Sequence, residues 1–456
     1  MTATIMDEPA PVRDEAAPWP APSTAWRTLW VLSLVLGLSQ IDRNILSLLL
    51  QPIKQDLKLS DAEMGILIGL AFSCVYLLLS FPLARISDRR SRRVMIAAGV
   101  AVWSLATAAC GLARSFWPLF VARAGLGAGE AANGPATYSM LADSFPREKL
   151  PRAMAVLNVG FVGGTAISLI IGGVVIAALS KVHVTLPLLG AVHTWQLVFF
   201  AIGLPGLLVA ALMLTVTEPA RRGPGTAGQT AVAAPIWAVF VFLARNGRLY
   251  GCMFLSIFLN GVIIVGTQNF RAAFFQRSYH WPAQEYGLVS GLVSLAASPL
   301  GLIAGVWLCE HWAARRHDGN MRVALVAYVV NIPFMALGPL MPQAWEAVAC
   351  TAASSALALM GAPPLVAAMQ SITPAGVRAQ VNSLYLLLFS GITGIVGPAF
   401  IGWLTDLQHD ETRLGYVMAI TAALVLPVST AIMAAAMKPY ARIIETIKAD
   451  EARQAA

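Results

Sequence analysis

The 456-residue chain is 57% hydrophobic and only 12% charged, with a formal net charge of +8 at pH 7. Soluble domains average about 25% charged residues, so this composition indicates a protein that spans a membrane. The excess of Lys and Arg follows membrane topology, and no nucleic-acid partner is expected. Five cysteines are scattered without a Cys-x-x-Cys pair. This pattern predicts neither disulfides nor a metal site, and no cofactor is expected.

Twelve apolar runs follow one another along the chain, each long enough to cross a hydrocarbon core of about 30 Å as a helix. The first six lie near 26–50, 63–83, 94–113, 117–141, 153–179 and 195–217. The second six lie near 248–274, 284–308, 321–340, 345–369, 381–407 and 413–437. The sequence therefore predicts an all-α membrane protein with twelve transmembrane helices in two pseudo-symmetric six-helix bundles, 26–217 and 248–437.

Three segments lie outside the predicted bundles. Residues 1–25 are rich in Pro and Ala and lack the basic and apolar regions of a signal peptide, so we expect a disordered cytoplasmic tail. Residues 218–247 begin with a Pro/Gly-rich stretch and are expected to form a cytoplasmic linker. Residues 438–456 are expected to form a short amphipathic helix at the cytoplasmic surface.

The two bundles share a sequence signal. Glu63 and Gly65, at the start of the second run, recur as Glu285 and Gly287 at the start of the eighth, at a constant offset of 222. Two similar halves that rock about a central site are a common construction of secondary transporters. The repeat therefore favours transport.

The distribution of Lys and Arg predicts the orientation. The tails and even-numbered loops hold 22 of the 31 basic residues, the odd-numbered loops hold six, and the predicted helices hold three. Because basic residues concentrate on the cytoplasmic side of a membrane, both termini are expected in the cytoplasm. Short loops and the absence of organellar targeting features favour a bacterial inner membrane.

The loop after the second helix reads Ala-Arg-Ile-Ser-Asp-Arg-Arg-Ser-Arg-Arg over residues 84–93. It resembles the signature loop of the major facilitator superfamily, Gly-x-Leu-Ala-Asp-Arg-x-Gly-Arg-Arg, although Ala84 and Ser91 replace the glycines. The resemblance implies that the loop aspartate pairs with the opposite half and latches the cytoplasmic side shut in the outward-open state. The latch residues implied are Asp88, Arg89, Arg92 and Arg93, with Glu310 in a degenerate second copy.

The first and fourth predicted helices resemble one particular branch of this superfamily. The first contains Gln-Ile-Asp-Arg-Asn over 40–44, and the fourth contains Ala-Arg-Ala-Gly-Leu-Gly-Ala-Gly-Glu-Ala over 122–131. Both segments look like those of the Spinster branch, whose animal members export sphingosine-1-phosphate or lysophospholipids. The resemblance implies transport of an amphipathic anionic lipid by alternating access.

Five ionisable residues fall inside the apolar runs: Asp42, Arg43, Arg123, Glu130 and Arg271. A charge at membrane depth costs about 2.5–3.5 kcal/mol on insertion scales, and such residues are usually functional. At about 1.5 Å per residue, Asp42 and Arg123 reach similar depth on the first and fourth helices, with Glu130 about 10 Å further along. We therefore expect Asp42 to pair with Arg123.

Such a cluster has two interpretations. A buried carboxylate that loses its arginine takes up a proton and releases it when the pair re-forms, which couples protons to an anion that competes for the guanidinium. On this interpretation Asp42 and Glu130 couple protons, while Arg43 and Arg123 bind substrate. The alternative is a static salt bridge between helices. Buried ion pairs are poor stabilisers, which favours coupling.

Further substrate-binding candidates are the polar residues Asn133, Tyr138 and Asn382. Arg271, near the outer end of the seventh helix, has two interpretations. It either binds substrate or extends its side chain to the outer interface.

Sequence motifs argue against other functions. His-Glu-x-x-His, Gly-x-Ser-x-Gly and Walker sequences are absent, so neither an enzyme nor an ATP-driven pump is predicted. A channel or receptor is disfavoured by the repeat and the buried charges. The expected function is proton-coupled secondary transport of a lysophospholipid or sphingosine-1-phosphate-like molecule by a monomer surrounded by membrane lipids. Transport of a small organic anion or drug is the alternative.

Overall fold

The computed structural model describes residues 19–87, 89–146, 148–182, 184–186, 190–221, 236–313, 316 and 318–455. Its N-terminal half is helical apart from a short antiparallel hairpin. The helices are α1 (Pro22–Leu48), α2 (Leu50–Leu57), α3 (Asp61–Ile68), α4 (Leu70–Ser87), α5 (Arg92–Cys110), α6 (Phe116–Ala131), α7 (Asn133–Ser144), α8 (Leu150–Leu179) and α9 (Thr194–Leu214). The hairpin strands are β1 (Val184–Leu186) and β2 (Gly190–Val192).

In the C-terminal half, the described elements are all helices, joined by loops. Its α-helices are α10 (Ile236–Arg245), α11 (Gly247–Ser278), α12 (Ala283–Ala313), α13 (Gly319–Leu337), α14 (Ala344–Ile372), α15 (Ala375–Leu386), α16 (Thr393–Asp406) and α17 (Leu414–Ala455). Two 3₁₀ turns, η2 (Gly338–Leu340) and η4 (Glu411–Arg413), and a π-helical segment, η3 (Leu387–Ile392), complete it.

Within the described residues, eleven helices are long and apolar enough to cross a membrane. They correspond to all the predicted spans except the fourth, 117–141. That run is divided at Ala132 into α6 and α7. Pro135 explains the break, because proline has no N–H and its ring clashes with the carbonyl four residues earlier, that of Ala131. The prediction of an all-helical membrane protein is confirmed.

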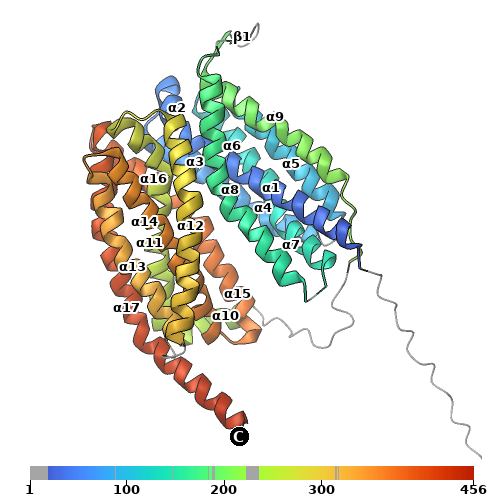
Figure 1. The fold of residues 1–456 in the computed structure, drawn as a ribbon, viewed down its shortest axis with the longest axis vertical. Coiled ribbons are helices and arrows are strands. Elements are labelled where there is room, and N and C mark those ends of the chain that lie inside the picture. The colour runs from blue at the N-terminus through green and yellow to red at the C-terminus, as the bar shows by residue number, and fades with distance from the viewer. Residues whose placement is uncertain are drawn as a thin grey trace, which may run out of the picture.

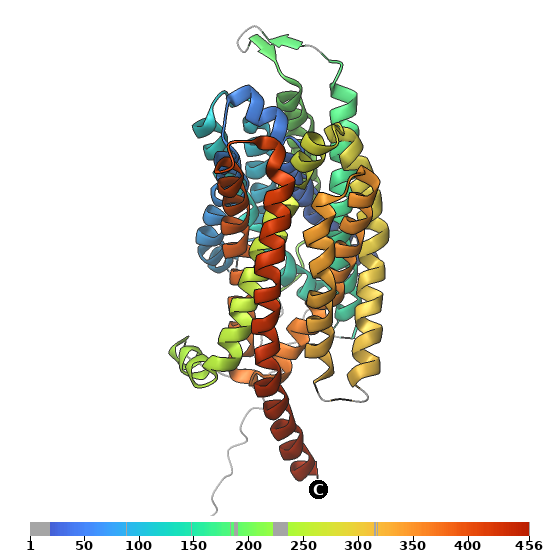
Figure 2. The same cartoon turned by 90° about the vertical axis from the view of Figure 1, so that its left-hand side faces the viewer.

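Helix boundaries differ from the predictions at three places. The first helix begins at Pro22, inside the predicted tail, whose residues 1–18 lie outside the described part of the chain. Helix α10 occupies part of the predicted linker 218–247, of which residues 222–235 are not described. The segment 438–456 does not form a separate helix, because α17 continues without interruption to Ala455 and extends beyond the bundle (Figure 2).

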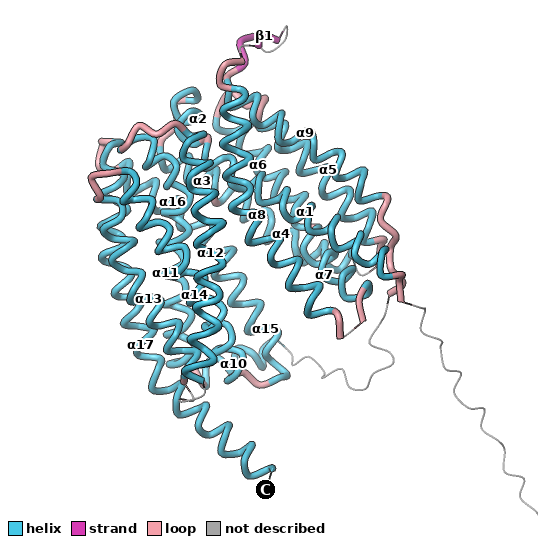
Figure 3. The backbone as a smooth tube through the Cα atoms, in the orientation of Figure 1, coloured by secondary structure: helices cyan, strands magenta, loops and turns pink. Residues whose placement is uncertain are grey.

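The helices form two bundles that touch at one end and separate toward the other (Figure 1). We call the end where α1 begins and α17 ends the terminal face, and the opposite end, with α2 and the β1–β2 hairpin, the distal face. Loops gather at these two faces (Figure 3). The halves meet mainly where α8 packs on α12 and α3 packs on α16.

Close backbone contact joins the halves near the distal face. A Cβ atom added to Gly65 on α3 would lie 2.4 Å from the carbonyl oxygen of Pro398, and one added to Gly173 on α8 would lie 2.7 Å from that of Gln284. One apolar core also crosses the boundary, and it includes Leu46, Met64, Phe270 and Ile401. The protein is therefore closed at the distal face and open toward the terminal face.

Candidate functional site

A buried ion pair joins α1 to α6. Arg43 donates from Nε and Nη2 to Oε2 of Glu130, at 2.8 and 2.5 Å. The Arg43 guanidinium also lies over the rings of Phe72 and Tyr76, 4.6 and 5.4 Å from their centroids, and these two rings stack on each other. The Arg43 side chain is 31% exposed, whereas that of Glu130 is 2% exposed. Arg43 is therefore the accessible member of the pair.

The predicted ion pair between the side chains of Asp42 and Arg123 is not formed, so this prediction is wrong. Arg123 donates from Nη1 to the main-chain oxygen of Asp42, at 3.2 Å, and among the described residues no ion pair joins the two side chains. The Asp42 carboxyl instead lies near Trp103 and Thr107 of α5. Residues 42 and 43 are about 100° apart around α1, so only Arg43 turns toward Glu130.

Unsatisfied polar atoms remain around this cluster. Oδ1 of Asp42, Nε of Arg123 and Oε1 of Glu130 are buried and have no hydrogen-bond partner within the described part of the chain. Unpaired buried polar groups are expensive, so they mark a place where a proton, water or ligand group can bind. With both carboxylates ionised, the two arginines and two carboxylates sum to zero charge. One added proton makes the cluster cationic.

The other predicted substrate-binding residues are not gathered in one place. Asn133 is buried, and its Oδ1 accepts a 2.7 Å hydrogen bond from the hydroxyl of Thr137 in the same helix, so this oxygen already has a hydrogen-bond partner within α7. Tyr138, on the next turn, is 48% exposed. Asn382 is partly exposed on α15. Arg271 is partly exposed and lines a separate cavity inside the C-terminal bundle.

Arg92, a predicted latch residue, is anchored within its own half. Its guanidinium binds Asp143 and Ser139 of α7 and lies 3.5 Å from Glu218 after α9. Glu218 also accepts hydrogen bonds from the Ser91 hydroxyl and from the Arg92 amide. Burial alone would raise the pKa of Glu218, but hydrogen bonds from Ser91 and Arg92 outweigh it and lower that pKa. Arg92 thus joins α5, α7 and the end of α9.

The remaining latch candidates form no contact between halves in the described structure. Asp88 lies outside the described residues. Arg93 donates to the carbonyl oxygen of Val216 in its own half, at 3.3 Å. Arg89 and Glu310 are exposed. A latch at this face stays a prediction, because the structure is open there.

A second ion cluster, which the sequence did not predict, closes the distal face. Arg277 of α11 donates from Nη2 and Nη1 to the two carboxylate oxygens of Asp61, at 2.7 and 2.9 Å. Lys54 lies 3.0 Å from Asp61 and 2.8 Å from Glu411. Asp406 accepts hydrogen bonds from the amide of Asp61, at 3.0 Å, and from the amide that follows it. Residues of both halves thus share one network.

Comparisons with known proteins agree with this architecture. The sequence matches the family model of the Major Facilitator Superfamily over residues 32–398. An MFS-type efflux pump of Mycolicibacterium smegmatis is 26% identical over 400 residues, 86% of each chain. Protein spinster homolog 1 of Rattus norvegicus is 29% identical over 220 residues, which cover 47% of this chain and 39% of that protein.

A solved structure shows the same fold. It is a bacterial homolog of the human lysosomal transporter Spinster in an inward-facing, unoccupied conformation, with a TM-score of 0.77 and 22% identity over 94% of this chain and 99% of that one. The family match covers most of the chain, and the fold and the membrane-spanning helices agree with it. The chain therefore belongs to the major facilitator superfamily and is a membrane transporter rather than an enzyme.

Proposed function

We propose that this transporter works by alternating access and carries an amphipathic anion, such as a lysophospholipid or a sphingosine-1-phosphate-like molecule, together with a proton. The Arg43–Glu130 pair carries this proposal, because it places a partly exposed guanidinium against a carboxylate that is 2% exposed. The lipid class is supported by the resemblance of segments 40–44 and 122–131 to the Spinster branch, and a spinster homolog is among the similar proteins.

Competition for Arg43 supplies the coupling. While Glu130 is ionised, it occupies two donors of the guanidinium. An anionic head group that takes these donors leaves a buried carboxylate without a partner, and such a group is far cheaper to bury when protonated. Binding of the anion and uptake of the proton by Glu130 therefore favour each other. Arg123 and Asp42 keep the surroundings neutral before the substrate arrives.

The substrate test is a binding series with one phosphate head group and progressively shorter tails. If the tail is buried in the protein, each lost CH₂ weakens binding by about 0.8 kcal/mol, roughly fourfold. Arg43→Lys should weaken binding by about tenfold, because an ammonium does not reproduce two-pronged phosphate recognition. Arg413→Lys, on the exposed distal surface, is the matched control and should leave affinity unchanged. Equal affinity across the series would rule out a lipid and favour a small organic anion.

We further propose that the terminal face is cytoplasmic and that the membrane is a bacterial inner membrane, which makes the structure inward-open. The excess of Lys and Arg near this face supports that orientation. In a background without native cysteines, Arg90→Cys should react with an impermeant thiol reagent only from the cytoplasm. Gln343→Cys, at the exposed distal start of α14, should react from outside. Labelling of both positions from the same side would contradict the orientation.

A further inference from the structure

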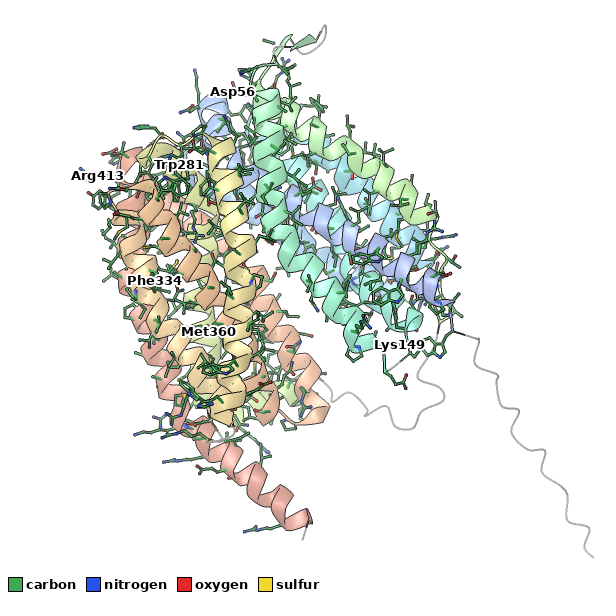
Figure 4. All side chains as sticks on the ribbon, in the orientation of Figure 1. Asp56, Lys149, Trp281, Phe334, Met360 and Arg413 are labelled. Carbon is green, nitrogen blue, oxygen red and sulfur yellow. The ribbon has the colours of Figure 1, made fainter. Side chains whose placement is uncertain are left out.

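Arg271 points into the interior of the C-terminal bundle. Two residues earlier on α11, Asn269 accepts a 2.8 Å hydrogen bond from Ser47 of α1, so that side of the helix faces the N-terminal half. Residue 271 lies about 200° further around the helix and therefore faces away from it. Its side chain lines a cavity between α11, α13, α14 and α17, together with Phe334 of α13. Figure 4 labels Phe334 on the C-terminal bundle.

The cavity has the character of an anion site. Its volume, measured as the room for water-sized groups, is about 20 Å³, so it takes only a compact group. Aromatic and aliphatic side chains form most of its wall, and Thr351 and Ser354, which carry hydroxyl groups, line it from α14. Tyr286 of α12 also lies close to Arg271. Hydroxyl groups and one guanidinium are suitable donors for a phosphate or carboxylate.

The charge of Arg271 is uncompensated. In the described part of the chain, no carboxylate lies within 4.0 Å of its guanidinium, whereas Arg43 is paired and the central cluster sums to zero charge. A cation held at membrane depth without a counter-charge is costly, so it calls for an anion supplied from outside the chain.

A second cavity lies one turn further from the distal face. It is lined by α11, α13, α14, α15 and η3, and its volume, measured in the same way, is about 60 Å³. Its lining is mainly apolar. One exception is Asn331, which is buried and whose Oδ1 has no hydrogen-bond partner among the described residues. The two cavities follow each other along α11, from Ile264 in one to Thr267 in the other.

We propose that Arg271, Thr351 and Ser354 form a binding site for a compact anionic group, a phosphate or a carboxylate, separate from the central cluster. The anion accepts hydrogen bonds from the guanidinium and the two hydroxyls. The source of the anion is either a free ion or the head group of a single-chain lipid whose tail lies along the second cavity. The site binds an anion whichever molecule the protein transports.

Calorimetric titration of the purified full-length protein in zwitterionic nanodiscs tests this site. The probes are inorganic phosphate and a twelve-carbon lysophosphatidate, and the background is Arg43→Gln, which removes the accessible arginine of the central cluster. Arg271→Gln in this background should weaken binding of both probes by about tenfold or more. The double variant Thr351→Val with Ser354→Val keeps the guanidinium but removes the hydroxyls, and it should weaken binding of both probes several-fold. Arg413→Gln, an exposed arginine of the same half, is the matched control.

The two probes separate the sources of the anion. If lysophosphatidate binds much more tightly than phosphate, the anion at this site is a lipid head group. If the two affinities are equal, it is a free ion. The proposal is overturned if Arg271→Gln and the double hydroxyl variant both bind the probes as the background does. It is also overturned if Arg43→Gln alone abolishes binding, because the anion would then bind only at the central cluster.

Discussion

The Glu130→Gln variant should lose substrate accumulation driven by a pH gradient while it still binds substrate. Glutamine keeps the size of the side chain and a hydrogen-bond acceptor for Arg43, but it carries no titratable proton. Because residue 130 then takes up no proton when the anion binds Arg43, an imposed gradient has nothing to drive. Uptake into proteoliposomes, measured with and without a pH step, should therefore be equal for this variant.

The stability of the same variant should also fall. Arg43 would lose its counter-charge and two charge-assisted hydrogen bonds, at a cost of about 1–3 kcal/mol. The double variant Arg43→Gln with Glu130→Gln removes both charges and should recover most of this loss without recovering coupling. The melting temperatures of the single and double variants distinguish a lost pair from general damage to the fold.

Asp42→Asn provides a contrast within the same cluster. Oδ1 of Asp42 has no hydrogen-bond partner among the described residues, and Arg123 contacts its main-chain oxygen instead of its carboxyl. The substitution should therefore change the melting temperature little. Its effect on pH-driven uptake reports whether Asp42 shares the proton with Glu130. If neither Asp42→Asn nor Glu130→Gln alters the pH dependence of uptake, proton coupling at this cluster is wrong.

The membrane spans could be predicted because length and apolarity alone define them. The break in the fourth helix was also present in the sequence, since Pro135 lies inside the run 117–141. The depth of the ionisable residues in the membrane could be predicted as well, because the rise per residue sets how far along a helix each residue lies. These properties belong to one helix at a time.

The partners of the buried charges could not be predicted in the same way. Asp42 and Arg43 are neighbours in the sequence, and the rotation of α1 decides which of them meets Glu130 of α6. Helix α1 is apolar around most of its circumference, so no hydrophobic stripe in its sequence indicates how it is rotated. The depth of the cluster was therefore foreseen, and the pairing of Asp42 with Arg123 was wrong.

The distal cluster could not be foreseen for a different reason. Its members come from α2, α3, the end of α11, the end of α16 and η4, and they meet only when the two halves close at that face. One sequence signal was present. Lys54 and Arg277 are two of only six basic residues in the odd-numbered loops, where such residues are scarce. Their scarcity did not reveal their partners.

The Asp61→Asn variant should open the distal face. Asp61 is 1% exposed and binds Arg277 through both oxygens and Lys54 through one. Removing one partner of a buried ion pair costs about 3–5 kcal/mol, and this cost falls only on the conformation in which the halves touch at the distal face. Conformations of a transporter differ by a few kcal/mol, and each step of about 1.4 kcal/mol is a factor of ten, so the ratio of the two states should shift by roughly 100-fold to a few thousand-fold.

Spin labels on the two halves measure this shift. Labels at Lys58 and Gln343 report the distal face, and labels at Glu148 and Gly376 report the terminal face; all four positions are exposed. Relative to the unsubstituted protein, Asp61→Asn should lengthen the distal distance and shorten the terminal one. Asp410→Asn is the matched control, because Asp410 is an exposed acid on the same face whose one ion pair among the described residues is with Arg413. Distances that stay unchanged in Asp61→Asn would show that apolar packing, and not the ion cluster, holds the distal face closed.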